Sequence, residues 1–147
     1  MNDIFVGNKT LDLTLYYSLK KNKNGNVFVT IVKEDDALKM LLDTDKKDDV
    51  QKLLTKWSLQ GWLNAHNLVT SSMQYDHTTG NQKFNPHIYR DAKLKQCLID
   101  WDCKDSDGSP VPCNELSINN LHWQIAAALI DLYEEATEPK QDDATKN

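Results

Sequence analysis

PHIYRDAKLKQCLIDWDCKDSDGSPVPCNELSINNLHWQIAAALIDLYEEA, residues 86–136, carries the strongest core signal in the chain. An asparagine at position 85 caps a helix whose first residue is Pro86, where proline fits because that position needs no N–H donor. Apolar side chains then recur at helical spacing in this segment, namely Leu94, Cys97, Leu98 and Trp101. The pattern predicts one amphipathic helix that begins at Pro86, after the Asn85 cap, and runs to Trp101.

The second half of the same stretch predicts a polar turn and a last helix. Residues 105–108 (DSDG) form the turn, and residues 109–112 (SPVP) are extended because proline fixes φ and disfavours helix in its predecessor. The last helix begins near residues 117–120 and ends before Pro139. Its buried face consists of Ile118, Leu121, Ile125, Leu129, Leu132 and Tyr133.

Upstream, two segments alternate between apolar and polar residues, which is typical of half-buried strands. The first contains Leu11, Leu13 and Leu15, the second contains Val27, Val29 and Ile31, and an Asn-Gly step lies between them. Asn-Gly supplies the positive φ angles that a tight turn needs, so residues 11–33 are predicted to form a β-hairpin. Two segments follow, a short helix over residues 34–42 and an exposed loop over 43–49.

The segment between this loop and the long stretch is partly ambiguous. Residues 50–57 have helical apolar spacing but are short enough to be a third strand. Ser58 is a suitable N-cap for a helix. The apolar face of that helix is predicted to contain Leu59, Trp62, Leu63, His66, Val69 and Met73.

These patterns predict an α+β fold that is mostly α, in which an N-terminal β-hairpin packs on a small bundle of three to four helices. We expect a single compact domain over residues 1–138, with the hairpin at 11–33 and the helical part at 58–136. Residues 139–147 lack apolar side chains that could anchor them, and are expected to be a flexible acidic and polar tail.

Composition excludes several classes of function. The chain has 147 residues, 39% of them hydrophobic, and a net charge of −5. An acidic chain is a poor ligand for nucleic acid, whose recognition depends on clustered Lys and Arg. No apolar run approaches the roughly 20 residues that a membrane span requires. Three cysteines without an apparent secretory leader favour free thiols in a reducing compartment.

No catalytic or metal-binding pattern is apparent. Residues 103–114 resemble a calcium loop only at DSDG, because Cys103 and Asn114 stand where the bracketing acids would be. The three cysteines and His122 lack the spacing of a zinc site. There is no nucleophile elbow and no glycine-rich phosphate loop. We therefore expect neither an enzyme nor a bound metal or cofactor.

Large aromatic side chains are the best candidates for partner binding. Core or rim packing is favoured for Trp57, Trp62 and Trp101. Trp123 lies off the apolar face of the last helix, so it either anchors an interface or packs against the hairpin. The candidate partner-binding residues are Trp123, Trp62, Tyr133 and Tyr75.

One order of features resembles a known family. Residues 53–57 (LLTKW) precede a helix with Trp62, and residues 75–80 (YDHTTG) are followed by Phe-Asn-Pro at 84–86. Residues 101–112 (WDCKDSDGSPVP) fit the pattern W-[DN]-x-x-D-x-D-G-x-P-[VL]-P ahead of a closing helix. This resembles the tail assembly chaperone-like proteins of long-tailed bacteriophages over residues 53–135. The chain departs from the family at residues 119–123, where Leu-Pro commonly opens the last helix.

The resemblance implies a viral protein that assists virion morphogenesis in the host cytoplasm. Its partners would be the tape-measure and tail-tube proteins, and it would bind neither nucleic acid nor a membrane. A homo-oligomer is possible. Two alternatives remain: a virion structural component (tail, neck or capsid decoration protein), and a small phage protein that binds a host protein. A frameshifted longer product would favour the chaperone.

Overall fold

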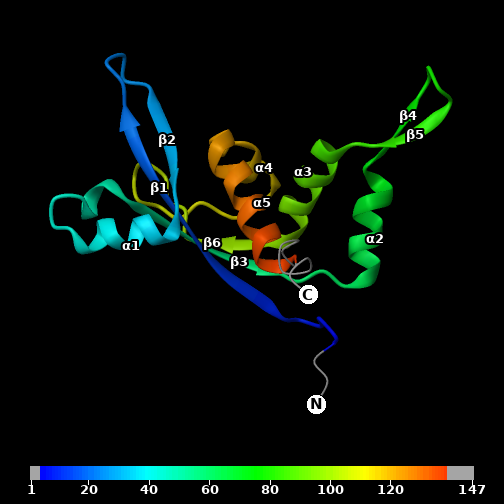
Figure 1. The fold of residues 1–147 in the computed structure, drawn as a ribbon, viewed down its shortest axis with the longest axis horizontal. Coiled ribbons are helices and arrows are strands. Elements are labelled where there is room, and N and C mark those ends of the chain that lie inside the picture. Colours follow the sequence, from blue (N-terminus) through cyan, green and yellow to red (C-terminus); the bar gives the residue numbers. More distant parts are fainter. Residues whose placement is uncertain (1–3, 139–147) are drawn as a thin grey trace, which may run out of the picture.

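The computed structural model describes residues 4–138, which form an α+β fold (Figure 1). The strands are β1 (Thr10–Lys21), β2 (Val27–Val32), β3 (Gln51–Ser58), β4 (Met73–Asp76), β5 (Asn81–Phe84) and β6 (Leu98–Trp101). The helices are α1 (Glu34–Leu42), the 3₁₀ turn η1 (Lys47–Asp49), α2 (Trp62–Ser71), α3 (Pro86–Cys97), α4 (Glu115–Asn119) and α5 (Trp123–Thr137).

Four strands form an antiparallel sheet in the order β2-β1-β3-β6, and β4 and β5 form a separate hairpin. The long strand β1 joins the halves of the sheet: residues 10–17 pair with β3, whereas residues 16–21 pair with β2. The end of the β1–β2 hairpin therefore extends past β3. In Figure 1, α3, α4 and α5 lie together over one side of the sheet, and α1 lies apart from them beside the hairpin.

The predicted mostly-α fold class is wrong, although the predicted β-hairpin over residues 11–33 is confirmed as β1 and β2. The described chain is 40% helical and 30% strand, and its centre is a four-stranded sheet, not a helical bundle. The range 58–136 that was predicted to be helical also contains β4, β5 and β6. The helix predicted over 34–42 is confirmed as α1. The predicted tail at 139–147 lies outside the described residues.

The ambiguous segment 50–57 is the strand β3. Its burial alternates, with Leu53, Thr55 and Trp57 inside. Leu54 completes the helical spacing in the sequence but lies on the open face of the sheet, where it is 51% exposed. Because Leu54 is apolar although it faces solvent, the sequence of β3 does not show the alternation of apolar and polar residues that is typical of a strand.

The helix predicted to reach Trp101 ends at Cys97, and Leu98–Trp101 is the edge strand β6. A register shift next to Trp57 sets Leu98 opposite Trp57 and Trp101 opposite Thr55. The extra residue lets two positions three apart both be buried. Their spacing therefore imitates a helix in the sequence.

The core lies between the inner face of the sheet and helices α3 and α5. Trp57 has no exposed surface and its ring stacks on Tyr133 of α5, with ring centres 4.7 Å apart. The Tyr133 hydroxyl donates to the carbonyl of Ser58 at 2.7 Å, so the end of β3 is tied to α5. The predicted buried face of the last helix is confirmed at Ile118, Ile125, Leu129 and Tyr133.

Of the two predicted helix N-caps, the structure confirms Asn85 and does not confirm Ser58. Asn85 caps α3 as predicted, because its side chain accepts the N–H groups of His87 and Ile88. Ser58 does not cap α2; it is the last residue of β3, and α2 begins at Trp62 behind an extended Gly61.

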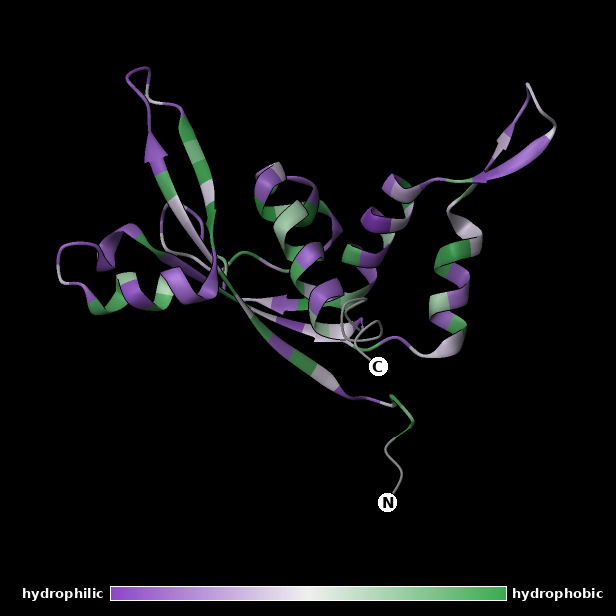
Figure 2. Cartoon of the chain, in the orientation of Figure 1, coloured by the Kyte–Doolittle hydropathy of each residue, from purple (hydrophilic) through white to green (hydrophobic). Residues whose placement is uncertain are grey.

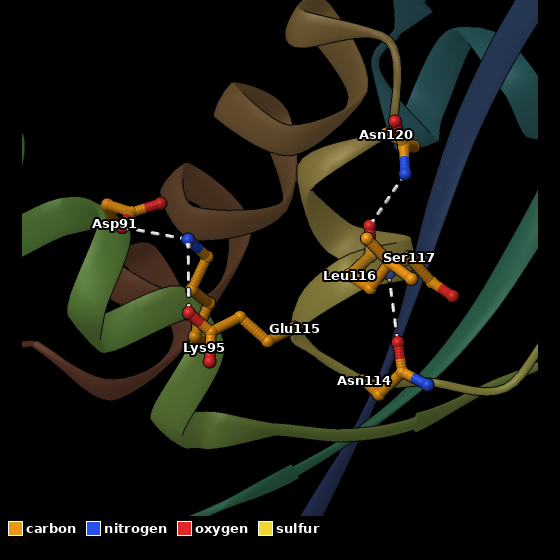
Figure 3. A network of polar contacts seen from close by, with 7 residues as sticks. All are labelled: Asp91, Lys95, Asn114, Glu115, Leu116, Ser117 and Asn120. Carbon is orange, nitrogen blue, oxygen red and sulfur yellow. Dashed lines mark hydrogen bonds and ion pairs between the residues drawn. The ribbon is translucent and has the colours of Figure 1, made fainter.

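The predicted single last helix is broken into α4 and α5 (Figure 3). The Asn114 side chain caps α4 by accepting the N–H of Ser117 at 2.9 Å. At its other end, the Asn120 side chain donates to the carbonyl of Leu116. These bonds satisfy backbone groups that a short helix leaves unpaired at its ends, and so stabilise the break.

Candidate protein-binding surface

Helix α2 exposes most of its apolar side chains to solvent. Trp62 is 83% exposed, Leu63 68% and Val69 43%, whereas Leu68 is the only buried residue of the helix. The Trp62 ring stacks on His66 with ring centres 5.6 Å apart. Figure 2 shows hydrophobic bands along this helix at the edge of the molecule. We call α2, β4 and β5 together the arm.

Hydrogen bonds hold the junction between α2 and β4 against the start of α3. Ser72 is completely buried, and its hydroxyl donates to the carbonyl of Leu68 at 2.6 Å. The Ser72 carbonyl in turn accepts the N–H of Asn85, whose side-chain amide also donates to Gln74 at 2.8 Å. The residue that caps α3 therefore also fixes where the arm leaves the body, and the rest of the arm projects outward (Figure 1).

The β4–β5 hairpin ends the arm with an ordered turn. The Asp76 carboxylate accepts the N–H of Thr78 at 2.9 Å, which lowers the pKa of Asp76, and it also lies 3.6 Å from the Lys83 ammonium. Gly80 has a φ of +72°, which explains the glycine at this position. Tyr75 is 57% exposed and packs edge-on against His77. A rigid turn thus presents an exposed aromatic pair.

The structure separates the four predicted partner-binding residues. Trp62 and Tyr75 both lie on the arm and are exposed, so the core packing favoured for Trp62 is wrong. Trp123 is 73% exposed at the first position of α5 and does not pack in the core. Tyr133 is only 1% exposed, so a partner cannot reach it in this structure. The core positions predicted for Trp57 and Trp101 are confirmed.

The sequence pattern placed Leu63 and Val69 on one apolar face of a helix but did not identify them as candidate partner-binding residues. An apolar stripe at helical spacing can pack against the protein's own core or against a binding partner, and the spacing does not distinguish the two. The one available signal was the neighbouring polar content: in the ten residues of α2, two asparagines, a threonine and a serine leave room for few buried contacts.

A buried lysine lies beside the core tyrosine. Lys93 is 3% exposed, and its ammonium group is 2.9 Å from the Glu138 carboxylate and 5.9 Å from the centre of the Tyr133 ring. Burial lowers the pKa of Lys93, but the hydrogen bond to Glu138 and the nearby acidic groups outweigh it, so the net shift is upward. This arrangement is a paired charge at the end of α5.

Besides the arm, a concave surface of about 370 Å³ lies along β1, β3 and β6 and is lined by residues that include Asp12, Lys56 and Asp100. A groove of about 360 Å³ lies between the inner side of the β1–β2 hairpin and the turn before α5, lined by residues that include Tyr17, Leu121 and Ile125. Among residues 4–138, no group of three or more His, Cys, Asp or Glu side chains could hold a metal ion. None of the helices in this range is long and apolar enough to cross a membrane.

All three cysteines are free, as predicted, and their burial makes stability sensitive to alkaline pH. Burial, with the nearby Asp102 carboxylate, raises the pKa of Cys103 to about 12, and burial raises that of Cys113 to about 11. Above the ordinary thiol pKa of 9.0 the unfolded chain loses these protons and the folded chain keeps them. Stability is therefore complete below pH 9 and falls as the pH rises toward the folded-state values.

We expect the free energy of unfolding to fall by about 2 kcal/mol between about pH 8 and 10.5, after a discount for the partial exposure of both thiols. Urea unfolding under reducing conditions at the two pH values measures this change. The variant Cys103→Ala/Cys113→Ala should show a shallower pH dependence, with the remainder supplied by groups whose pKa values are also raised, namely Cys97, Tyr17, Tyr133 and Lys93. An equal slope in both proteins would assign the effect to other groups.

No protein family, no curated protein and no solved structure matches this chain.

Proposed function

We propose that this protein is a non-enzymatic binding protein that assists the assembly of a phage tail in the host cytoplasm, as tail assembly chaperones do. Its partners would be the tape-measure and tail-tube proteins, which it holds before they are incorporated. The resemblance of residues 53–135 supplies the choice of partner. The observation that supports binding is the exposed apolar surface of the arm.

The size of that surface suits reversible binding. Full burial of a side chain such as Leu63 contributes about 1.5–3 kcal/mol. Trp62 is the type of residue that dominates binding energy at the centre of an interface. Two or three such side chains offset the costs of association without making the complex permanent. A helper that must release its client needs this intermediate strength.

The position of the arm also suits a client that is larger than the protein itself. The Ser72–Asn85 hydrogen bond joins the arm to the start of α3, and most apolar side chains of α2 are exposed. A client helix or loop could therefore pack on α2 without disturbing the sheet. Trp123, on a different element, would be a second contact.

Co-expression tests this proposal. We would express the tape-measure and tail-tube proteins encoded beside this gene, each alone and each together with this chain. We expect at least one of them to become soluble and to co-purify with the chain. If both stay equally soluble or insoluble and neither binds the purified protein, the chaperone function is excluded.

A further inference from the structure

The two edges of the central sheet differ in how they are protected. The edge strand β6 has four residues, includes a charged Asp100 and contains the register shift, and the Cys113 thiol contacts the carbonyl of Leu98. The other edge, β2, has six residues with no charge, no proline and an uninterrupted register against β1. Exposed apolar edges of this kind readily pair with another strand.

The side chains of β2 are also unusually exposed for their chemistry. Phe28 is 52% exposed, Ile31 40% and Val27 39%, whereas Val29 is buried against the core. Figure 2 shows β2 as an almost continuous hydrophobic strand beside a largely hydrophilic end of β1. Such a strand lowers its free energy when a second apolar strand covers it.

The hairpin turn determines which backbone groups of β2 are free. The N–H of Asn22 donates to the carbonyl of Asn26 at 2.9 Å, so these two residues form a hydrogen-bonded pair. Such pairs alternate along an antiparallel ladder, so the backbone groups of residues 28, 30 and 32 bond toward β1. The groups that face the open edge belong to Val27, Val29 and Ile31. Within residues 4–138, no backbone hydrogen bond outside the sheet involves them.

Charged groups at the two ends of β2 are complementary to each other. Three exposed lysines lie at the hairpin end before β2, namely Lys20, Lys21 and Lys23. Three exposed acids form the first turn of α1 directly after β2, namely Glu34, Asp35 and Asp36. In the described part of the chain no ion pair involves any of the six. The acids outnumber the one lysine beside them, Lys33.

We propose that β2 is the docking site for a second copy of this chain, paired antiparallel about a twofold axis at Thr30. The two four-stranded sheets then become one continuous sheet. Antiparallel pairing brings the lysine-bearing tip of each copy next to the acidic start of α1 in the other copy. A twofold axis makes this contact twice, because both partners use the same surface.

This register satisfies the edge both chemically and geometrically. Val29 of one copy faces Ile31 of the other, and both present outward backbone groups, so they exchange hydrogen bonds. Phe28 faces the second copy's Val32 on the opposite side of the sheet. A register shifted by one residue would place backbone groups that face the open edge of one copy opposite groups that already bond to β1 in the other copy. That register is therefore excluded. The inference does not depend on the chaperone proposal.

The first test is the oligomeric state of the purified chain and of Thr30→Lys. Sedimentation velocity should show a dimer of the wild-type protein. Thr30→Lys places two like charges on the axis and should weaken dimerisation by about tenfold or more. Leu54→Lys adds the same charge to the central strand β3 and should leave the dimer intact. A monomeric wild-type protein, or equal dimerisation in both variants with native circular dichroism, would overturn the proposal.

The second test uses charge reversal. One variant carries lysine at Glu34, Asp35 and Asp36, and the other carries glutamate at Lys20, Lys21 and Lys23. Each variant alone should be mostly monomeric, because like charges meet at both contacts. A mixture should form a one-to-one dimer, because opposite charges then meet at both. Failure of the mixture to associate, when each variant is folded, would contradict the proposed contact.

Discussion

Trp57→Ala is expected to lower the free energy of unfolding by about 3–5 kcal/mol, the cost of removing a large buried aromatic side chain. The indole is completely buried and stacks on Tyr133, and its Nε1 donates to Thr55 Oγ1 at 2.7 Å. Thr55 Oγ1 donates in turn to the carbonyl of Leu13 at 2.8 Å, so the substitution also disturbs the link between β3 and β1. Such a loss is a large share of the 5–15 kcal/mol that stabilises a typical domain.

Trp123→Ala is the matched control, because it removes the same side chain from a position that is 73% exposed. Surface substitutions usually change stability by no more than about 0.5 kcal/mol. Urea unfolding followed by circular dichroism measures both variants. Similar midpoints for Trp57→Ala and Trp123→Ala would show that Trp57 is not at the centre of the core, and the sheet-and-helix arrangement described above would be wrong.

Trp62→Ser/Leu63→Ser is expected to leave folding nearly unchanged and to weaken binding of the proposed client by about 150-fold or more. The reason is that both side chains are mostly exposed in the free protein, and burial of each against a client would contribute about 1.5–3 kcal/mol. Isothermal titration with a purified tape-measure or tail-tube client measures the affinity. Thermal unfolding of the same sample checks the fold.

Leu42→Ser serves as the control for this pair, since Leu42 is 87% exposed but lies on α1, away from the arm. It should bind the client as tightly as the wild-type protein does. If the arm variant binds normally, the arm is not the client surface. If instead the arm variant loses several kcal/mol of stability, Trp62 and Leu63 contribute to folding, and a loss of client binding could not be assigned to the arm surface.

The sequence predicted the local elements well where period and capping agreed. Asn85 and Pro86 placed the start of α3 correctly, and alternation with Asn-Gly placed the hairpin. The face of α5 that contains Ile125 and Leu129 was also correct. In each case the segment contained one clear signal, a helix cap or a hydrophobic period, and no second pattern that predicted a different structure.

The errors arose where tertiary structure reversed a local signal. Leu54 left β3 ambiguous between a helix and a strand, and the register shift beside Trp57 made β6 look helical, so the predicted fold contained neither strand. Leu98 and Trp101 are buried together only because β3 lies opposite them. No local pattern contains that information, because it depends on a strand more than 40 residues away in the chain.

The candidate surface could be predicted only in part for the same reason. Trp62 and Tyr75 were identified as aromatic side chains available to a partner, and the structure leaves both exposed. Tyr133 has the same chemistry but lies on the buried face of α5, where Trp57 covers it. Residue type indicates what a side chain can contribute; its neighbours decide whether a partner can reach it.

The proposed function implies that a long-tailed phage encodes this chain, and its most direct test is mass spectrometry of purified particles of that phage, beside the lysate of infected cells. The proposed function predicts the protein in the lysate and its absence from finished particles. Detection in particles at a copy number comparable to that of the tail proteins would contradict it, and would identify the chain as a structural component of the virion.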